Sequence, residues 1–463
     1  MRRALKKITA FILAFILAAA FSGCAELTGL DAQSLMSPPK TTADREAIYA
    51  LMCGDQTDVT LVYPKNGDYR SAIISRDLNG DGSLEVVSFC ANSEAGGIRV
   101  QFFSKDENGT WYSMAQFVST ANQVDKLFFG DLTGDGQEEV VVGWGDPQTA
   151  TASISVYRMA ENAVQEFPLS TVTYSEMLLT DFDDDAVQEL FVLEVAAQVS
   201  EEENTVATPL GSLYRFDSTN PYVALTVPLD TAVIRYLAAS FVQVNTWRHM
   251  AVLDGVKADG RMITQIVGYD DVNEMLVSHL SNASAEEPNP TDRATAVAVT
   301  CRDINGDGVT EIPTVELVLD PGEGTADSTA YLVTWNTYSM ADNKFTPVCT
   351  SILNTTENYF ILLPENENKI ACVNDTVTRT ATFFRYSRMD YSGQPVGREE
   401  LFAVTVYTEE EWKAKQEAED SDEDIHLGSM AGRVYALHVL DGSLSADSTL
   451  IRSVTEGFKI LNE

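Results

Sequence analysis

The stretch Asp77-Leu-Asn-Gly-Asp-Gly-Ser-Leu-Glu85 lies between two apolar segments, Ala72–Ile74 and Val86–Val87. Apolar and β-branched runs on either side of a loop rich in glycine and aspartate are typical of two strands joined by a turn. The same nonapeptide pattern returns three times, with starts at Asp131, Asp181 and Asp303. Four copies of one loop indicate that the chain is built from an internal repeat.

The spacing of the loops describes the size of this repeat. Their starts are 54, 50 and 122 residues apart, and the long interval leaves room for one degenerate copy. We place that copy at the strand Ala251–Leu253, the loop Asp254–Arg261 and the strand Met262–Val267. A further eroded copy is expected at Tyr359–Val373. A period of this length is typical of blades or of a solenoid rather than of independent domains.

A hairpin follows each loop. In the first copy, Val100–Phe103 leads into the turn Lys105–Gly109 and then to Trp111. Two strands around the loop and two in the hairpin make a four-stranded antiparallel unit. Because a single sheet of this kind cannot bury both of its faces, the units must stack, and radial stacking gives a β-propeller.

Six such units fit between Ala72 and about Tyr407. Segments near the two ends of the chain could supply four more strands: Val59–Tyr63, Arg433–Leu440, Thr449–Val454 and Phe458–Leu461. We therefore predict an all-β protein, a β-propeller of seven four-stranded blades closed by strands from both ends. Six blades are the alternative.

The loops also have the chemistry of a metal site. Oxygen-bearing side chains recur at positions 1, 3 and 5 of each loop, an acid recurs at position 9, and glycine at position 6 allows a tight turn. Calcium takes roughly six to eight oxygen ligands. We predict about four structural calcium sites, with these ligands: Asp77, Asn79, Asp81, Glu85, Asp131, Thr133, Asp135, Glu139, Asp181, Asp183, Asp185, Glu189, Asp303, Asn305, Asp307 and Glu311.

An EF-hand is excluded, because it needs Glu at position 12 and flanking helices. Position 12 is Ser88, Val142, Val192 or Thr314, and the flanks are rich in β-formers. The alternative to calcium is that the loops are only tight acidic turns. The third loop argues for a cation, because like charges this close destabilise a compact state. It holds five acids within nine residues: Asp181, Asp183, Asp184, Asp185 and Glu189.

These loops and strands resemble the FG-GAP/VCBS repeat family, the calcium-loop propeller repeats of integrin α-subunits and many bacterial surface proteins. The second copy carries Phe129-Gly130 before its loop and Gly145-Asp146-Pro147 after it, close to the motif that names the family. The resemblance covers about residues 55–400 and implies a calcium-binding propeller that acts in binding or adhesion. Three features depart from it: Glu instead of Asp at position 9, Thr133 at position 3 and Ala186 in place of glycine.

The first 24 residues look like a bacterial lipoprotein signal. Four basic residues within the first seven positions precede the apolar run Ala10–Phe21, which ends in Phe21-Ser-Gly-Cys24. Such a run is too short to cross a bilayer of about 30 Å. We predict a signal peptide at residues 1–23, a lipid on Cys24, a tether at 24–43 and one propeller domain at 44–463. The protein would then lie on the extracytoplasmic face of the cell membrane. An ordinary secretory signal cleaved nearby is the alternative.

The composition limits the class of partner. The 463 residues include 69 Asp or Glu and 31 Lys or Arg, a formal charge of −38, and 44% are hydrophobic. That apolar content excludes intrinsic disorder as the main state. The charge argues against nucleic acid, because phosphate binding needs clusters of Lys and Arg. Four calcium ions would neutralise only part of the charge, so solubility is the expected role of the remaining acids.

One segment departs from the β pattern. Thr408 and Glu411 have capping-box spacing and begin a helix expected to end near Glu419, and the acidic run Asp420–Asp424 follows. We interpret residues 408–430 as a solvated insertion at the edge of a blade. A calcium-binding or partner-binding patch is the alternative.

Motifs of catalysis are absent. The four histidines lie in no HExxH motif, and there is no GxSxG, no GxxxxGK[ST] and no GxGxxG. We expect the histidines to be surface or core residues: His249, His279, His426 and His438. We expect four tryptophans to be core residues, with a sugar-stacking surface as the alternative: Trp111, Trp144, Trp247 and Trp335.

Five cysteines follow Cys24, an odd number without metal-like spacing. They are Cys53, Cys90, Cys301, Cys349 and Cys372. Cys349 could pair with Cys372, or Cys53 with Cys90, and the sequence leaves this open.

We therefore expect a lipid-anchored, calcium-binding β-propeller that binds a protein or a glycan outside the cytoplasm and is not an enzyme. Two alternatives remain. A polysaccharide-active enzyme would place acids with raised pKa in a central pocket, and a structural subunit of an envelope complex would have a stoichiometric partner.

Overall fold

The computed structural model describes residues 43–54, 59–92, 96–146, 151–160, 163–167, 169, 173–195, 209–217, 220–245, 248–280, 289–293, 299–318, 330–339, 344–364, 369–389, 395–417, 424–445 and 448–461. The predicted signal peptide, Cys24 and all but the end of the predicted tether lie outside these residues. So do Pro147, Trp247 and most of the acidic run after Glu417.

Six antiparallel sheets of four or five strands follow one another along the described chain, together with one two-stranded ribbon. The first three sheets have the predicted four-stranded unit. The first contains β1 (Ile73–Arg76), β2 (Glu85–Ala91), β3 (Ile98–Lys105) and β4 (Trp111–Ser119). The second contains β5 (Gln123–Gly130), β6 (Glu139–Asp146), β7 (Thr151–Ala160) and β8 (Ala163–Phe167). The third contains β9 (Glu176–Thr180), β10 (Glu189–Glu194), β11 (Leu210–Phe216) and β12 (Pro221–Pro228).

The fourth sheet also has four strands in sequential order, whereas the fifth and sixth have five strands and depart from this plan. The fourth contains β13 (Val233–Asn245), β14 (Arg248–Lys257), β15 (Met262–Asp270) and β16 (Met275–His279). The fifth contains β17 (Ile312–Val318), β18 (Ala330–Ser339), β19 (Lys344–Asn354), β20 (Tyr359–Leu363) and β28 (Phe458–Ile460). The sixth contains β21 (Ile370–Asp375), β22 (Thr380–Arg385), β25 (Glu399–Thr408), β27 (Arg433–Val439) and β26 (Asp424–Met430). The ribbon pairs β23 (Arg388–Met389) with β24 (Pro395–Val396).

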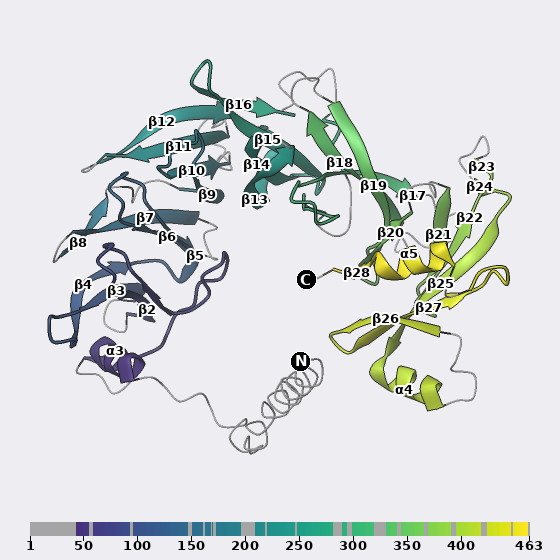
Figure 1. Ribbon diagram of the computed structural model, residues 1–463, viewed down its shortest axis with the longest axis horizontal. Helices are drawn as coiled ribbons and strands as arrows, with labels where there is room; N and C mark the ends of the chain where they lie inside the picture. The colour runs from purple at the N-terminus through teal and green to yellow at the C-terminus, as the bar shows by residue number, and fades with distance from the viewer. Residues whose placement is uncertain are drawn as a thin grey trace, which may run out of the picture.

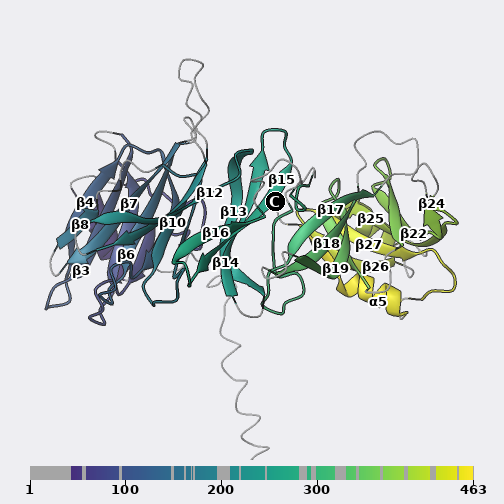
Figure 2. The same cartoon turned by 90° about the horizontal axis from the view of Figure 1, so that it is seen from above.

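The sheets follow one another around an arc, with the first and sixth at its two ends (Figure 1). Seen from above, they form a row along the longest axis (Figure 2). Neighbouring sheets share buried apolar clusters from the first pair to the last. Phe89 meets Trp144 between the first two sheets, and Phe167 meets Phe216 between the next two. The stacked four-stranded sheets have the arrangement of propeller blades, and the fold is all-β as predicted.

Helix α3 (Ala43–Cys53) covers the first sheet on the side away from the second. Its Ile48 and Met52 are buried in one cluster with Val86 and Phe103. The Nη2 of Arg99 donates to the carbonyl of Met52 at 3.1 Å. The sequence analysis assigned no structure to this segment, which follows the predicted tether directly.

The strands expected to close a seventh blade are used elsewhere. Residues predicted as the strand Thr449–Val454 form helix α5 (Thr449–Glu456), capped by Ser448, and this prediction was wrong. The physical reason is helical spacing, because Leu450, Ile451 and Val454 face one core between the fifth and sixth sheets. The predicted strand near the C-terminus exists as β28 but pairs with β20 in the fifth sheet.

The two remaining segments also join existing sheets. Strand β27 lies in the sixth sheet between β25 and β26, and near the N-terminus only Leu61 makes a bridge, to Cys90 of the first sheet. A seventh sheet is therefore not found in the described part of the chain, and neither is a pairing between the first and sixth sheets.

The structure of the two degenerate copies differs from the predicted strand–loop–strand unit. Asp254 lies within β14, and the turn that joins β14 to β15 comes later, at residues 258–261. The strands predicted around residue 366 exist as β20 and β21, but they belong to neighbouring sheets. That connection therefore links two blades instead of forming a loop within one. Pairing partners decide this, and a strand pattern by itself does not reveal them.

A buried ion pair ties the end of the fourth sheet to the chain that follows it. Arg293 is 0% exposed, and its Nη2 lies 2.8 Å from the Oδ1 of Asp254, which is 2% exposed. The guanidinium also donates to the carbonyl of Val299 and to the hydroxyl of Thr264. The other carboxylate oxygen of Asp254 accepts from the backbone N–H of Cys301 at 2.7 Å. Both charges are thus fully enclosed and fully bonded.

The helical insertion was predicted correctly at its start, but residues 424–430, which were expected to belong to it, form strand β26 of the sixth sheet. Helix α4 runs from Glu409 to Glu417, and Glu411 accepts from the backbone N–H of Thr408 at 2.7 Å while the Thr408 hydroxyl accepts from the N–H of Glu411. The five described cysteines are all free, so neither disulfide forms. Trp144 and Trp335 are core residues as predicted, whereas Trp111 is partly exposed and donates to Asp44 of α3. Among the described residues, none of the helices is long and apolar enough to cross a membrane.

Candidate functional site: four acidic loops and a pocket

The four loops share one backbone geometry. In each, the Asp at position 1 accepts hydrogen bonds from the backbone N–H groups at positions 5 and 6. The residue just before the loop pairs with position 9: Arg76 with Glu85, Gly130 with Glu139, Thr180 with Glu189 and Arg302 with Glu311. The predicted repeat is therefore a real structural unit, and its register is the same in all four copies.

Positive φ angles explain the glycines of the loops. In the first, second and fourth loops, the glycines at positions 4 and 6 have φ between 72° and 86°. The third loop has Asp184 and Ala186 there, at φ of 59° and 72°. Residues with a Cβ are strained in this region. The requirement at position 6 was predicted from the sequence, whereas the same requirement at position 4 was not.

The Glu at position 9 is the buried end of each loop. Its side chain is at most 1% exposed in all four copies, and its Oε2 accepts from the backbone N–H of position 2 at 2.8–3.0 Å. Burial raises the pKa of Glu139 and of Glu189 to about 7, and nearby aspartates add to the effect. Burial also raises the pKa of Glu85 and Glu311. A negative charge is thus costly at these four positions.

The second oxygen of this Glu, Oε1, has a different partner in each loop. In the first loop it accepts from Ser104 at 3.3 Å and from Asn79 at 3.4 Å. In the second loop it accepts from the hydroxyl of Thr133 at 3.3 Å and lies 3.7 Å from Nε of Arg158, and in the third it accepts from Arg215 at 3.0 Å. In the fourth loop, Oε1 of Glu311 is buried and has no hydrogen-bond partner.

The fourth loop fits a cation. An anionic oxygen that is enclosed without a donor is strongly unfavourable unless the group takes up a proton or a positive charge is bound there. Asp303, Asn305 and Asp307 supply further oxygens in the same nine residues. In the third loop, Asp181, Asp183 and Glu189 bring one oxygen each within 4.8 Å of one another, although Arg215 already contacts two of them.

The first three loops lie along one rim. The backbone N–H of Glu138 in the second loop donates to the carbonyl of Leu78 in the first. The N–H of Gln188 in the third loop donates to the carbonyl of Asp131 in the second.

Residues 77–142 match the FG-GAP-like repeat. The match begins at position 1 of the first loop and ends three residues after the second loop, so it contains the first two acidic loops and most of the first sheet. The third and fourth loops lie outside the matched residues but have the same hydrogen bonds. The part of the predicted resemblance that concerns this segment is confirmed.

No curated protein matches the chain. Among solved structures, a protein from Lactobacillus plantarum is 12% identical, with coverage of 68% of this chain and 81% of that one and a TM-score of 0.28. The Dos1 propeller is 11% identical, and the match covers 65% of this chain and 62% of that one, with a TM-score of 0.27. CoXyl43, a GH43 β-xylosidase/α-arabinofuranosidase from a compost metagenome, is 10% identical, with coverage of 63% and 96% and a TM-score of 0.25. Likenesses at this level carry no argument about function.

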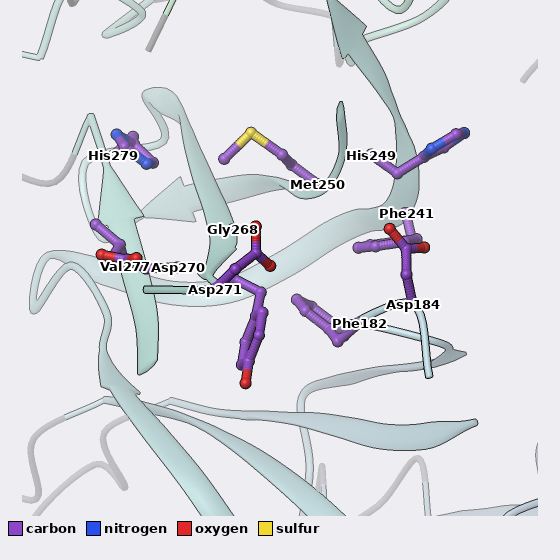
Figure 3. Close-up of a pocket in the computed structure, with 11 residues that line it drawn as sticks. Phe182, Asp184, Phe241, His249, Met250, Gly268, Asp270, Asp271, Val277 and His279 are labelled. Carbon is purple, nitrogen blue, oxygen red and sulfur yellow. The ribbon is translucent and has the colours of Figure 1, made fainter. Parts of the chain in front are cut away.

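A pocket of about 490 Å³ lies between the third and fourth sheets, beside the third acidic loop, which begins at Asp181. Phe182 and Asp184 of that loop form one side, next to Phe241, and His279 and Val277 lie opposite (Figure 3). Phe182 and Phe241 are 4.8 Å apart between ring centroids, and Phe241 stacks on His249 at 6.0 Å. These three rings form one wall.

The floor and rim of this pocket are polar. Tyr269, Asp270 and Asp271 come from the end of β15 and the turn after it. Burial lowers the pKa of His279, which favours the neutral form of its imidazole. His249 and His279 were expected only as surface or core residues, and the pocket was not predicted, because its lining comes from one loop of the third sheet and the four strands of the fourth, whose packing no local pattern reveals.

Proposed function

We propose that this chain is a calcium-ordered binding module, anchored outside the cytoplasm by a lipid on Cys24, and that it takes a glycan in the pocket between the third and fourth sheets. The observation that carries the proposal is the pocket itself, with its wall of aromatic rings and its acidic rim. Its volume lies within the range of ordinary ligand sites, about 300–1,000 Å³.

The chemistry of the pocket suits a sugar. A pyranose ring has an apolar face of C–H groups that packs on aromatic rings, and hydroxyls around its edge that donate hydrogen bonds. Phe241 and Tyr269 offer such faces, and the carboxylates of Asp184 and Asp271 are pure acceptors. Specificity then comes from a few polar groups around a rigid β scaffold.

A pair of variants tests the pocket. We expect Asp184→Asn and Asp271→Asn each to weaken glycan binding about tenfold or more, because a charge-assisted hydrogen bond is lost. Asparagine tolerates the positive φ of Asp184, so the loop should keep its shape. The measurement is calorimetric titration of the purified protein with the best ligand from a panel of soluble wall-type oligosaccharides.

Glu107→Gln, an exposed change in a turn of the first sheet, is the matched control and should bind as the unmodified chain does. The pocket assignment fails if no oligosaccharide binds or if both pocket variants keep full affinity. Release of new reducing ends during the titration would instead assign a polysaccharide-active enzyme.

The anchor is tested separately. We expect Cys24→Ser to release the protein from membranes into the soluble extracytoplasmic fraction, because the lipid is attached to that thiol. Fractionation of cells that express the variant and the unmodified chain measures this, with Ser22→Ala as a neighbouring control. Unchanged membrane association of Cys24→Ser would remove the lipoprotein assignment.

A further inference from the structure

One position distinguishes the four loops. It is the residue that faces Oε1 of the position-9 Glu from the next strand of the sheet. The register identifies it, because Val86 pairs with Phe103, Val140 with Tyr157, Leu190 with Tyr214 and Ile312 with Asn336. Each Glu comes one residue before the first member of these pairs, so in antiparallel strands it faces the residue one position after the second member. These facing residues are Ser104, Arg158, Arg215 and Thr337.

The two arginines place a fixed positive charge inside their loops. Arg158 contacts Asp135 and Glu139, at positions 5 and 9 of the second loop. Arg215 contacts Asp183 and Glu189, at positions 3 and 9 of the third loop. A guanidinium does not lose its proton in proteins, so each of these contacts is permanent charge pairing.

The serine and threonine loops have no such charge. In the first loop a neutral hydroxyl donates weakly to Oε1 of Glu85. In the fourth loop Oε1 of Glu311 is enclosed without any donor. The fourth loop therefore keeps an unsatisfied anionic oxygen at the place where the second and third loops have a guanidinium.

We infer that Arg158 and Arg215 act as built-in counter-ions that replace calcium, so that the chain binds two calcium ions, in the first and fourth loops, instead of four. The inference rests on the proposed calcium binding of the loops. In the second or third loop, a divalent cation would have to displace the arginine from two of the acids that would otherwise bind the metal. The third loop has five acids, and Oδ1 of Asp183 has no hydrogen-bond partner, so its net charge alone would favour calcium. The guanidinium of Arg215 already occupies that place, and we expect this occupancy to exclude the metal.

The arginine of the third loop also fixes one wall of the proposed glycan pocket. Phe182 and Asp184, which line it, belong to the third loop, and Arg215 holds that loop from within. A loop closed by its own arginine keeps its shape without metal. The pocket is therefore independent of calcium, and only the first and fourth loops depend on it.

Calcium counted per chain tests the inference. The full-length protein, purified in detergent, is dialysed to equilibrium against buffered calcium, and bound metal is measured by atomic emission. We expect two equivalents in the unmodified chain, three in Arg158→Ser or Arg215→Ser, and four in the double variant. Each substitution places serine at the position that Ser104 occupies opposite the first loop. Arg235→Ser, an exposed arginine of the fourth sheet, is the control and should leave the count at two.

The reciprocal change keeps the test decisive if an arginine variant does not fold. Ser104→Arg, placed in the first loop, is expected to lower the count by one. Four equivalents in the unmodified chain, or a count that none of these substitutions changes, would overturn the inference. Four would leave the proposed calcium binding intact, whereas zero in every variant would remove that proposal as well.

Discussion

Replacing Arg293 by methionine is expected to lower the free energy of unfolding by about 3–5 kcal/mol, the usual cost of removing one partner of a buried ion pair. The change leaves the carboxylate of Asp254 enclosed without its positive partner. It also leaves the carbonyl of Val299 without the guanidinium that binds it. Urea denaturation followed by circular dichroism and tryptophan fluorescence measures the loss.

Arg261→Met is the matched control. Arg261 pairs with Asp292 at 2.7 Å, but its side chain is 41% exposed, so we expect a loss of about 1 kcal/mol or less. In a second variant, Arg293→Met combined with Asp254→Leu should recover part of the stability, because no lone charge then remains buried. Equal losses in the free energy of unfolding for Arg261→Met and Arg293→Met would show that the buried ion pair contributes no more than an exposed one.

Calcium is expected to raise the thermal unfolding midpoint by several degrees over the value in EDTA. A site that only the folded state offers adds about 2.7 kcal/mol at 100-fold saturation. Two sites together would add about 5 kcal/mol. Differential scanning calorimetry with millimolar calcium and then with EDTA makes the comparison, and magnesium serves as a control because it requires a stricter octahedral geometry.

A pair of loop variants assigns that stabilisation. Asp77→Ala removes a ligand from the first loop and should lower stability more in calcium than in EDTA. Asp131→Ala makes the same change in the second loop, whose acids are contacted by Arg158 of β7, so its loss should be equal in both buffers. Equal losses for Asp77→Ala would mean that Asp77 binds no metal, and no effect of calcium on the unmodified chain would make all four loops simple acidic turns.

The loops and their flanking strands could be predicted because their information is local. Each copy places an apolar strand, a turn with Asp and Gly at fixed positions and a second strand within about 20 residues. The capping box of α4 is local in the same way, since Thr408 and Glu411 are three residues apart. Patterns of this range need no knowledge of how sheets pair.

The rest depended on pairing and packing. The residue that faces the position-9 Glu lies 19 residues later in the first two copies but 26 later in the third and fourth, because the hairpins differ in length. No fixed offset therefore reveals Arg215 next to Glu189. Helix α5 contains β-branched residues that favour a strand, and the core between two sheets overrides that preference.

The helix that covers the first sheet has a thermodynamic consequence. A closed ring of blades has no ends, so each blade depends on both neighbours and the ring melts together. Here α3 gives the first sheet a boundary of its own, and no buried cluster joins it to the sixth sheet in the described chain. We therefore expect stability to be a sum of each sheet's own contribution and its nearest-neighbour contacts, as in repeat arrays. Damage at one end of such a stack weakens the adjoining sheets first and reaches the far end last.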